Sequence, residues 1–358
     1  MGKPELKVPF REDEMTILGE YPGFGPGVPG TPVFKTPIQP YENLSMFLAD
    51  EKPLWMPSFF EYKTFNPRII KDNMARGMVS EAKPFFPMEA GGKDMFGIEW
   101  EFVPQAFGSM VSRKFKQLDD ISEWEKYLNF PDLKSLDWYQ CRKDNEEFLN
   151  DPRPVQMTIF TGLFERLVSV VGMTDALVSL ADEDAKPYVH GLFDRLCIYY
   201  DELFFYLAKW FEPDLLWFHD DWGSQRAGLF SLKTCREMIV PYLKRVVDSA
   251  HKYGIGFEFH CCGKNEALVP AMIDAGVDMW AGQILNDKEF IYKEYGQDIK
   301  IGITPPQVPL DASDEYIKDV VLDMLDKYPK NAFVGLEFGI DNRYYPHFYR
   351  ESRIKYNS

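Results

Sequence analysis

Residues 231–260, SLKTCREMIVPYLKRVVDSAHKYGIGFEFH, decide the fold class. Apolar side chains recur at three- and four-residue steps between residues 238 and 250, which predicts an amphipathic helix. Ser231 is placed to cap the start of this helix, and Pro241 should kink it. The short apolar segment GFEFH that follows predicts a buried strand ending at His260. A helix that leads directly into a buried strand is the repeating unit of a parallel sheet.

The same alternation of strands and helices extends in both directions. Further strands are predicted at residues 154–160, 214–220, 277–282, 299–303 and 332–337, and further helices at residues 185–210, 264–276 and 313–327. This order predicts an α/β protein with parallel strands and helical crossovers. We favour a single (β/α)8 TIM-type barrel over residues 46–358, because no GxGxxG turn of a doubly wound nucleotide-binding sheet follows any predicted strand.

The N-terminal region differs in composition from the rest. Residues 19–40, GEYPGFGPGVPGTPVFKTPIQP, hold too many glycines and prolines for a regular element. We therefore assign residues 1–45 to an N-terminal extension that includes the start of the first helix. An ordered loop, a lid and an inter-subunit arm all fit this composition. The chain could therefore also form a homodimer.

Charge and cysteine content exclude several classes of protein. The 358-residue chain carries 56 acidic and 40 basic residues, a net charge of −16, which argues against binding to a nucleic-acid backbone. The first residues lack the apolar core of a signal peptide, and no apolar run approaches the roughly 20 residues of a membrane span. The five scattered cysteines do not resemble a disulfide framework. We expect a cytoplasmic protein with reduced thiols and no membrane or nucleic-acid partner.

Polar residues at the predicted strand ends suggest a metal site, because the chemistry of a barrel sits at the carboxyl ends of its strands. His260 and Cys262 lie two residues apart, so strand alternation points both to one side, where they could hold a cation. Glu337 at another strand end would be a third ligand, which leaves the open position of a catalytic zinc site. Alternatively, His260 is a hydrogen-bonded core residue beside small buried cysteines, and Glu337 pairs with a buried cation.

Asp220 and Asp221, in the segment HDDWGSQ, follow another predicted strand. A carboxylate pair suits general acid-base catalysis or substrate orientation, because neighbouring like charges raise one pKa. Helix capping and hydrogen bonding within the loop are the alternative. We expect the preceding His219 to pack in the interior without a further role.

Several segments resemble the uroporphyrinogen decarboxylase superfamily, in particular its zinc-dependent, corrinoid-linked methyltransferase branch. They are ENLSMFLADEKPLWMPSF (42–59), GGKDMFGIEWEF (91–102), DDWGSQ (220–225) and PYLKRVVDSAHKYGIGFEFHCCG (241–263). The family pattern is His-x-Cys followed by a third ligand that is often Cys. His260 and Cys262 match this pattern, whereas Glu337 replaces the second thiolate. The arginine-rich motif of the decarboxylases, close to RQAGR, is missing from the first hundred residues, which disfavours tetrapyrrole decarboxylation.

The resemblance implies methyl transfer to or from a corrinoid. A zinc ion with one thiolate and one carboxylate is a harder Lewis acid than one with two thiolates, and it is better matched to an ether oxygen. We therefore expect the methyltransferase component of an O-demethylase, which moves a methyl group from a small methoxylated, preferably aromatic, compound to a Co(I) corrinoid. Asp220 or Asp221 would protonate the released phenolate.

No short DxHxxG signature of a B12-binding domain is present, so the corrinoid (cobalamin) would be supplied by a partner protein. A methylcorrinoid-to-thiol methyltransferase is one alternative. A uroporphyrinogen decarboxylase-like protein without metal chemistry, acting as a scaffold or binding protein, is another.

Overall fold

A computed structural model describes residues 8–22, 30–104, 108–337 and 339–357. The chain forms two compact units. The terminal unit contains Met1–Lys63, Pro152–Pro154 and Met279–Ser358, and the central unit contains Thr64–Asp151 and Val155–Asp278. The predicted division into an extension and one barrel domain at residues 45 and 46 stays a prediction.

The central unit is built on parallel strands that contain few polar residues. They are β7 (Val155–Ile159), β8 (Leu215–His219) and β9 (Gly256–Cys261), and β8 pairs with both of the others. Every residue of these strands is buried, as expected for a parallel sheet covered on both faces. His219 lies opposite His260 in the register of β8 and β9. The predicted strands at 154–160, 214–220 and 256–260 are confirmed.

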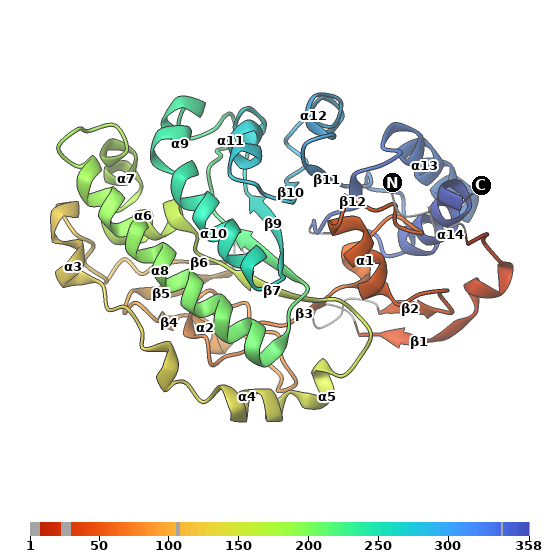
Figure 1. Ribbon diagram of the computed structural model, residues 1–358, viewed down its shortest axis with the longest axis horizontal. Helices are drawn as coiled ribbons and strands as arrows, with labels where there is room; N and C mark the ends of the chain where they lie inside the picture. Colours follow the sequence, from red (N-terminus) through yellow and green to blue (C-terminus); the bar gives the residue numbers. More distant parts are fainter. Residues whose placement is uncertain (1–7, 23–29, 105–107, 338, 358) are drawn as a thin grey trace. The chain divides into compact units, whose positions relative to one another are not determined.

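Helices connect these strands and cover them. The long helix α8 (Lys186–Phe211) confirms the helix predicted at 185–210, and it lies side by side with α10 (Val240–Lys252) in Figure 1. The helix expected between 231 and 254 is divided into α9 (Leu232–Met238) and α10, with Pro241 in the first turn of α10. A proline is tolerated there because the first turn leaves backbone N–H groups without helical partners. Ser231 caps α9 by accepting a hydrogen bond from the Thr234 amide, as predicted.

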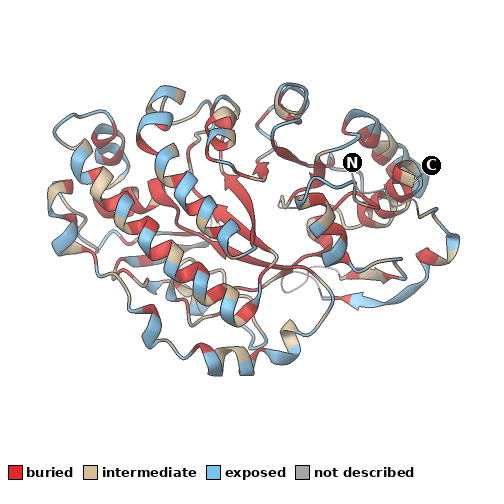
Figure 2. Cartoon of the chain, viewed as in Figure 1, coloured by how far each residue is buried: buried red, intermediate tan, exposed pale blue. Residues whose placement is uncertain are grey.

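Figure 2 shows the buried side of α8 and α10 and the exposed residues on the opposite side. The other helices of this unit are α2 (Lys71–Ala75), α3 (Trp124–Tyr127), α4 (Trp138–Asp144), α5 (Glu146–Leu149), α6 (Leu163–Val171), α7 (Met173–Ser179) and α11 (Val269–Asp274). An antiparallel sheet of β4 (Gly92–Lys93), β5 (Glu99–Val103) and β6 (Gly108–Val111) belongs to the same unit.

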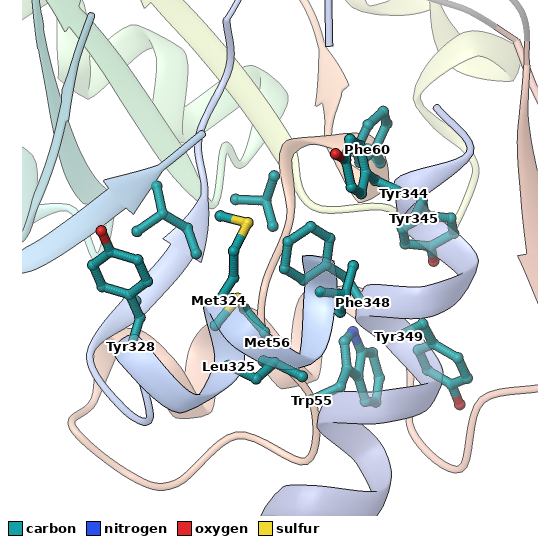
Figure 3. Packing of buried hydrophobic residues seen from close by; sticks show 14 of the residues in the cluster. Trp55, Met56, Phe60, Met324, Leu325, Tyr328, Tyr344, Tyr345, Phe348 and Tyr349 are labelled. Atoms are coloured by element: carbon teal, nitrogen blue, oxygen red, sulfur yellow. The ribbon is translucent and has the colours of Figure 1, made fainter. Parts of the chain in front are cut away.

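The terminal unit has its own parallel strands and its own apolar core. Strands β10 (Met279–Gly282), β11 (Lys300–Ile303) and β12 (Ala332–Val334) are parallel and confirm the predicted strands. The helices are α1 (Pro40–Leu48), α12 (Lys288–Tyr295), α13 (Asp314–Lys327) and α14 (Tyr344–Asn357). Figure 3 shows the core of this unit, in which Trp55, Met324 and Phe348 are buried.

A hairpin corrects one expectation for the N-terminal region. Strands β1 (Ile17–Tyr21) and β2 (Thr31–Phe34) pair as antiparallel strands, so the prediction of no regular element is wrong for their part of residues 19–40. Pro32 fits in β2 because each strand of a two-stranded sheet has one edge that needs no ladder hydrogen bond. Residues 23–29 of the Gly/Pro-rich stretch lie outside the described residues.

Parallel strands alternating with helices make the chain an α/β protein that is compatible with a TIM-like fold. The predicted closure into eight strands is not shown by the described residues and stays a prediction. Among those residues, no helix is both long and apolar enough to span a bilayer.

Candidate metal site

Two of the predicted metal ligands meet at the carboxyl end of the central sheet. His260 lies in β9 and Cys262 follows its last residue, and the two side chains point to the same side as predicted from strand alternation. The Cys262 Sγ lies 3.6 Å from the His260 Nε2. In a tetrahedral zinc site with Zn–N bonds of about 2.0–2.1 Å and Zn–S bonds of about 2.3 Å, neighbouring N and S donors are roughly 3.6 Å apart. The spacing and chemistry of this pair therefore fit zinc.

His219, which we expected only to pack, lies in the same cluster. Its Nε2 is also 3.6 Å from the Cys262 Sγ. The ligand atoms of His219, His260 and Cys262 all lie within 4.8 Å of one another. The two imidazole rings are stacked with centroids 5.3 Å apart, and Trp217 stacks on His260 at 4.4 Å. The central unit thus places two imidazoles and one thiol close enough together to bind one metal ion.

Carboxylates surround His219. Its Nδ1 lies 2.7 Å from Glu165 Oε2, and its Nε2 lies 3.3 Å from Asp221 Oδ1. Burial lowers the pKa of His219, but the negative charges of Glu165 and Asp221 outweigh burial and raise this pKa well above its ordinary value. An imidazolium between two carboxylates is therefore the metal-free alternative to ligation.

Cys262 is the thiol of this cluster, and its neighbour Cys261 is not part of it. Burial raises the pKa of the Cys262 thiol, while a hydrogen bond from His219 opposes the shift. Cys261 is fully buried, and its sulfur accepts a hydrogen bond from the Trp222 amide at 3.0 Å. All five cysteines are free thiols. The cluster of His219, His260 and Cys262 therefore contains one thiol.

The two predicted catalytic aspartates have different environments. Asp220 is fully buried and accepts hydrogen bonds from the backbone amides of Phe164 and Glu165 and from the Trp222 indole. These contacts cap the start of α6 and correspond to the alternative that we considered from the sequence. Burial raises the pKa of Asp220 to about 7.

Asp221 lies closer to the cluster. Its Oδ1 accepts a hydrogen bond from the Cys262 amide at 2.8 Å, and its side chain is 34% exposed. Burial acts to raise the pKa of Asp221, but the charge of His219 and the Cys262 amide lower it overall. Of the two aspartates, Asp221 has the carboxylate that a substrate could reach. A catalytic role for either residue stays a prediction.

Glu337, the third predicted ligand, belongs to the terminal unit. Strand β12 ends at Val334, so Glu337 lies beyond the strand rather than at its last position. Its Oε2 accepts a hydrogen bond from the Ile284 amide at 3.3 Å within the same unit. Ligation of a metal by Glu337 stays a prediction.

The site also contains His219 and Glu165, which were not predicted from the sequence as site residues. A signal for His219 was present, because the segments Phe218-His219 and Phe259-His260 both stand at the end of a predicted strand. Adjacent parallel strands in matching register place two such histidines side by side. Glu165 carries no comparable signal, since it lies in a helix that begins after β7.

The parallel α/β architecture brings together a cluster of imidazoles, a thiol and carboxylates that could hold a metal ion. A family model described as uroporphyrinogen decarboxylase (URO-D) matches residues 214–341. This match supports the uroporphyrinogen decarboxylase superfamily, whose members are generally enzymes. The matched segment contains every predicted site residue and His219.

No curated protein matches the chain. Among solved structures, the chain is similar to two from Parabacteroides distasonis ATCC 8503, each described as a sugar phosphate isomerase/epimerase. The first has a TM-score of 0.34 and 13% identity over 62% of this chain and 80% of that chain. The second has a TM-score of 0.34 and 8% identity over 64% of this chain and 78% of that chain.

Proposed function

We propose that the protein is a zinc-dependent methyltransferase, the component of an O-demethylase that moves a methyl group from a methoxylated aromatic compound to the Co(I) corrinoid of a partner protein. The observation that carries this proposal is the single thiol of Cys262 at zinc-site distance from His260. The match to the uroporphyrinogen decarboxylase family model over this region supports it.

The donor set favours oxygen chemistry over thiol chemistry. A second thiolate would make a bound zinc ion softer, and Cys261 is turned toward the Trp222 amide instead. Zinc held by His260 and Cys262 would supply Lewis acidity toward the ether oxygen of the substrate. In the overall reaction the O–CH3 bond breaks, its electron pair stays on oxygen, and the methyl group passes to the partner's cobalt.

The neighbouring aspartates have separate tasks in this proposal. Asp220 holds the start of α6 in place through the amides of Phe164 and Glu165. Asp221, with a partly exposed carboxylate beside the cluster, would orient the substrate and relay a proton from solvent to the released phenolate.

A methyl-transfer assay tests the direction of the reaction. The zinc-loaded protein is mixed with 2-methoxyphenol and cob(I)alamin as the corrinoid probe, and methylcobalamin formation is followed by absorbance. We expect methylation of cobalt that is lost in Cys262→Ser and retained in Cys141→Ser, which changes a thiol outside the cluster. A parallel assay offers methylcobalamin and a small thiol, and turnover only in this assay would assign the protein to thiol methylation.

Zinc content separates the enzyme from a protein without metal chemistry. We expect about one zinc per chain after purification without added metal, as for a tight three-ligand site. Only traces of zinc, together with no turnover in either assay, would favour a decarboxylase-like scaffold in which His219 is simply paired with Glu165 and Asp221.

A further inference from the structure

We infer that His219 is a third protein ligand of the metal ion held by His260 and Cys262, and that Glu165 is the residue that positions its ring. This inference rests on the metal site of the proposed function and not on the direction of methyl transfer. The ligand is a divalent ion that accepts nitrogen and sulfur donors in tetrahedral geometry, such as Zn²⁺ or Co²⁺.

The distances between the donor atoms fit a shared metal ion. The Cys262 Sγ is 3.6 Å from the Nε2 of His219 and 3.6 Å from the Nε2 of His260. Both values equal the roughly 3.6 Å that separates nitrogen and sulfur donors around tetrahedral zinc. The same distances are compatible with hydrogen bonds between the thiol and the two rings, and a Co²⁺ titration distinguishes ligation from hydrogen bonding.

The backbone register of β8 and β9 holds the two histidines together. His219 is paired with His260 on adjacent parallel strands, and their rings are nearly parallel at an interplanar angle of 15°. Each histidine is 7–8% exposed, so the strands rather than flexible loops hold both rings. Ligands carried on strands are positioned with little loss of conformational freedom on binding.

The other ring nitrogen of His219, Nδ1, contacts a carboxylate. A metal-binding histidine usually donates its second N–H to a carboxylate, which sets the tautomer and the ring orientation. Glu165 Oε2 lies 2.7 Å from Nδ1 of His219 and so directs Nε2 toward the thiol. The other carboxylate oxygen, Oε1, accepts a hydrogen bond from Arg76 at 3.3 Å.

Glu165 is itself firmly placed. Its backbone amide donates to Asp220 at 2.8 Å at the start of α6, and the Arg76 guanidinium also donates to Thr161 Oγ1 at 3.0 Å. Glu165 and Arg76 have side-chain exposures of 14% and 12%. The hydrogen bonds from Arg76 to Glu165 and between Glu165 and Nδ1 of His219 therefore hold the imidazole ring on the side away from the thiol.

With His219 included, the central unit supplies three donors, two imidazoles and one thiolate, and a tetrahedral ion keeps one open position. This is the arrangement of a catalytic rather than a structural zinc site. Asp221 lies beside this cluster, because its Oδ1 is 3.3 Å from the His219 Nε2.

Cobalt substitution tests the inference without any methyl transfer. The purified chain is stripped with a chelator and titrated with Co²⁺ while thiolate-to-cobalt charge-transfer and visible d–d bands are recorded. His219→Gln should lose the intense tetrahedral d–d bands and bind Co²⁺ at least about tenfold more weakly. Glu165→Gln should keep the charge-transfer band, shift the d–d bands and weaken binding by about 10- to 100-fold.

His251→Gln is the matched control, because His251 pairs with Asp278 on the outside of the same unit. Circular dichroism checks the folding of each variant. If His219→Gln does not fold, paramagnetic NMR of the Co²⁺-loaded wild-type protein decides the question, since two ligand histidines give two sets of shifted ring protons.

One set of shifted ring protons, or a folded His219→Gln variant with wild-type Co²⁺ affinity and spectrum, would overturn the inference. This failure is distinct from that of the proposed function. If only the inference about His219 fails, Co²⁺ binding still depends on His260 and Cys262. If the proposed function fails, the metal binds but neither methyl-transfer assay turns over.

Discussion

Replacing Glu61 by Gln removes a buried carboxyl group from the core of the terminal unit. Glu61 is 2% exposed and accepts hydrogen bonds from the Trp55 indole at 2.9 Å and from the Tyr345 hydroxyl at 3.0 Å. Burial raises the pKa of Glu61 from its ordinary 4.5 to about 7, although these hydrogen bonds oppose the shift. The charged form of Glu61 therefore costs stability in the folded protein.

The sign and size of the effect follow from this pKa. Below pH 4.5 the carboxyl is protonated in both the folded and the unfolded state, so it adds no penalty. Between pH 4.5 and about 7 unfolding releases a proton, so stability falls as pH rises. Above about pH 7 the charged carboxyl lowers the free energy of unfolding by its full amount. The pKa rises from 4.5 to about 7, and at about 1.36 kcal/mol per pKa unit this change corresponds to about 3 kcal/mol.

Urea unfolding of the wild-type protein and of Glu61→Gln, followed at pH values from acid to slightly alkaline, measures this difference. Subtracting the two stabilities cancels the other titrating groups. Glu315→Gln, which removes an exposed carboxyl from the same unit, controls for the loss of one charge. We expect the variant to gain about 3 kcal/mol relative to wild type as pH rises through the window. Parallel pH curves for the two proteins would refute the reasoning.

Other predictions concern the central unit and the site. Arg166→Met should destabilise the central unit by on the order of 3–5 kcal/mol in urea unfolding, because it leaves the carboxylates of Asp94 and Asp72 buried without their cation. Asp220→Ala should cost about 1–3 kcal/mol of unfolding free energy for each buried donor that loses its acceptor. Asp221→Asn should lower the rate of cobalt methylation and also reduce the unfolding midpoint, because His219 and the Cys262 amide stabilise the Asp221 carboxylate in the folded protein. An unchanged rate in the folded variant would remove Asp221 from the acid-base role. If Glu337 is a ligand, Glu337→Gln should weaken zinc binding about tenfold or more in competition with a chelator, whereas unchanged affinity would exclude it.

Local patterns were sufficient for much of the fold. The apolar periodicity of residues 238–250, the cap at Ser231 and the break near Pro241 all correspond to α9 and α10. These features depend on interactions between residues within a few positions of one another, so they can be predicted from a short stretch of sequence. The same holds for His260 and Cys262, because alternation along one strand settles that they share a side.

Two kinds of feature could not be predicted in this way. The hairpin of β1 and β2 is local, since Tyr21 pairs with Thr31, but it was missed because the glycines and prolines around it dominate the local signal. Contacts between residues far apart in the sequence are the second kind. The cap that Asp220 provides to α6 joins residues more than fifty positions apart.

The sequence by itself determined the order of the parallel strands from residue 154 onward and one His-x-Cys pair at a strand end. Only the tertiary structure decided which other side chains meet that pair, because the pairing of β8 with β9 brings His219 opposite His260 and the placement of α6 brings Glu165 to its ring. Register between strands and the packing of a helix on a sheet are settled by many weak contacts across the chain, and no short motif encodes them.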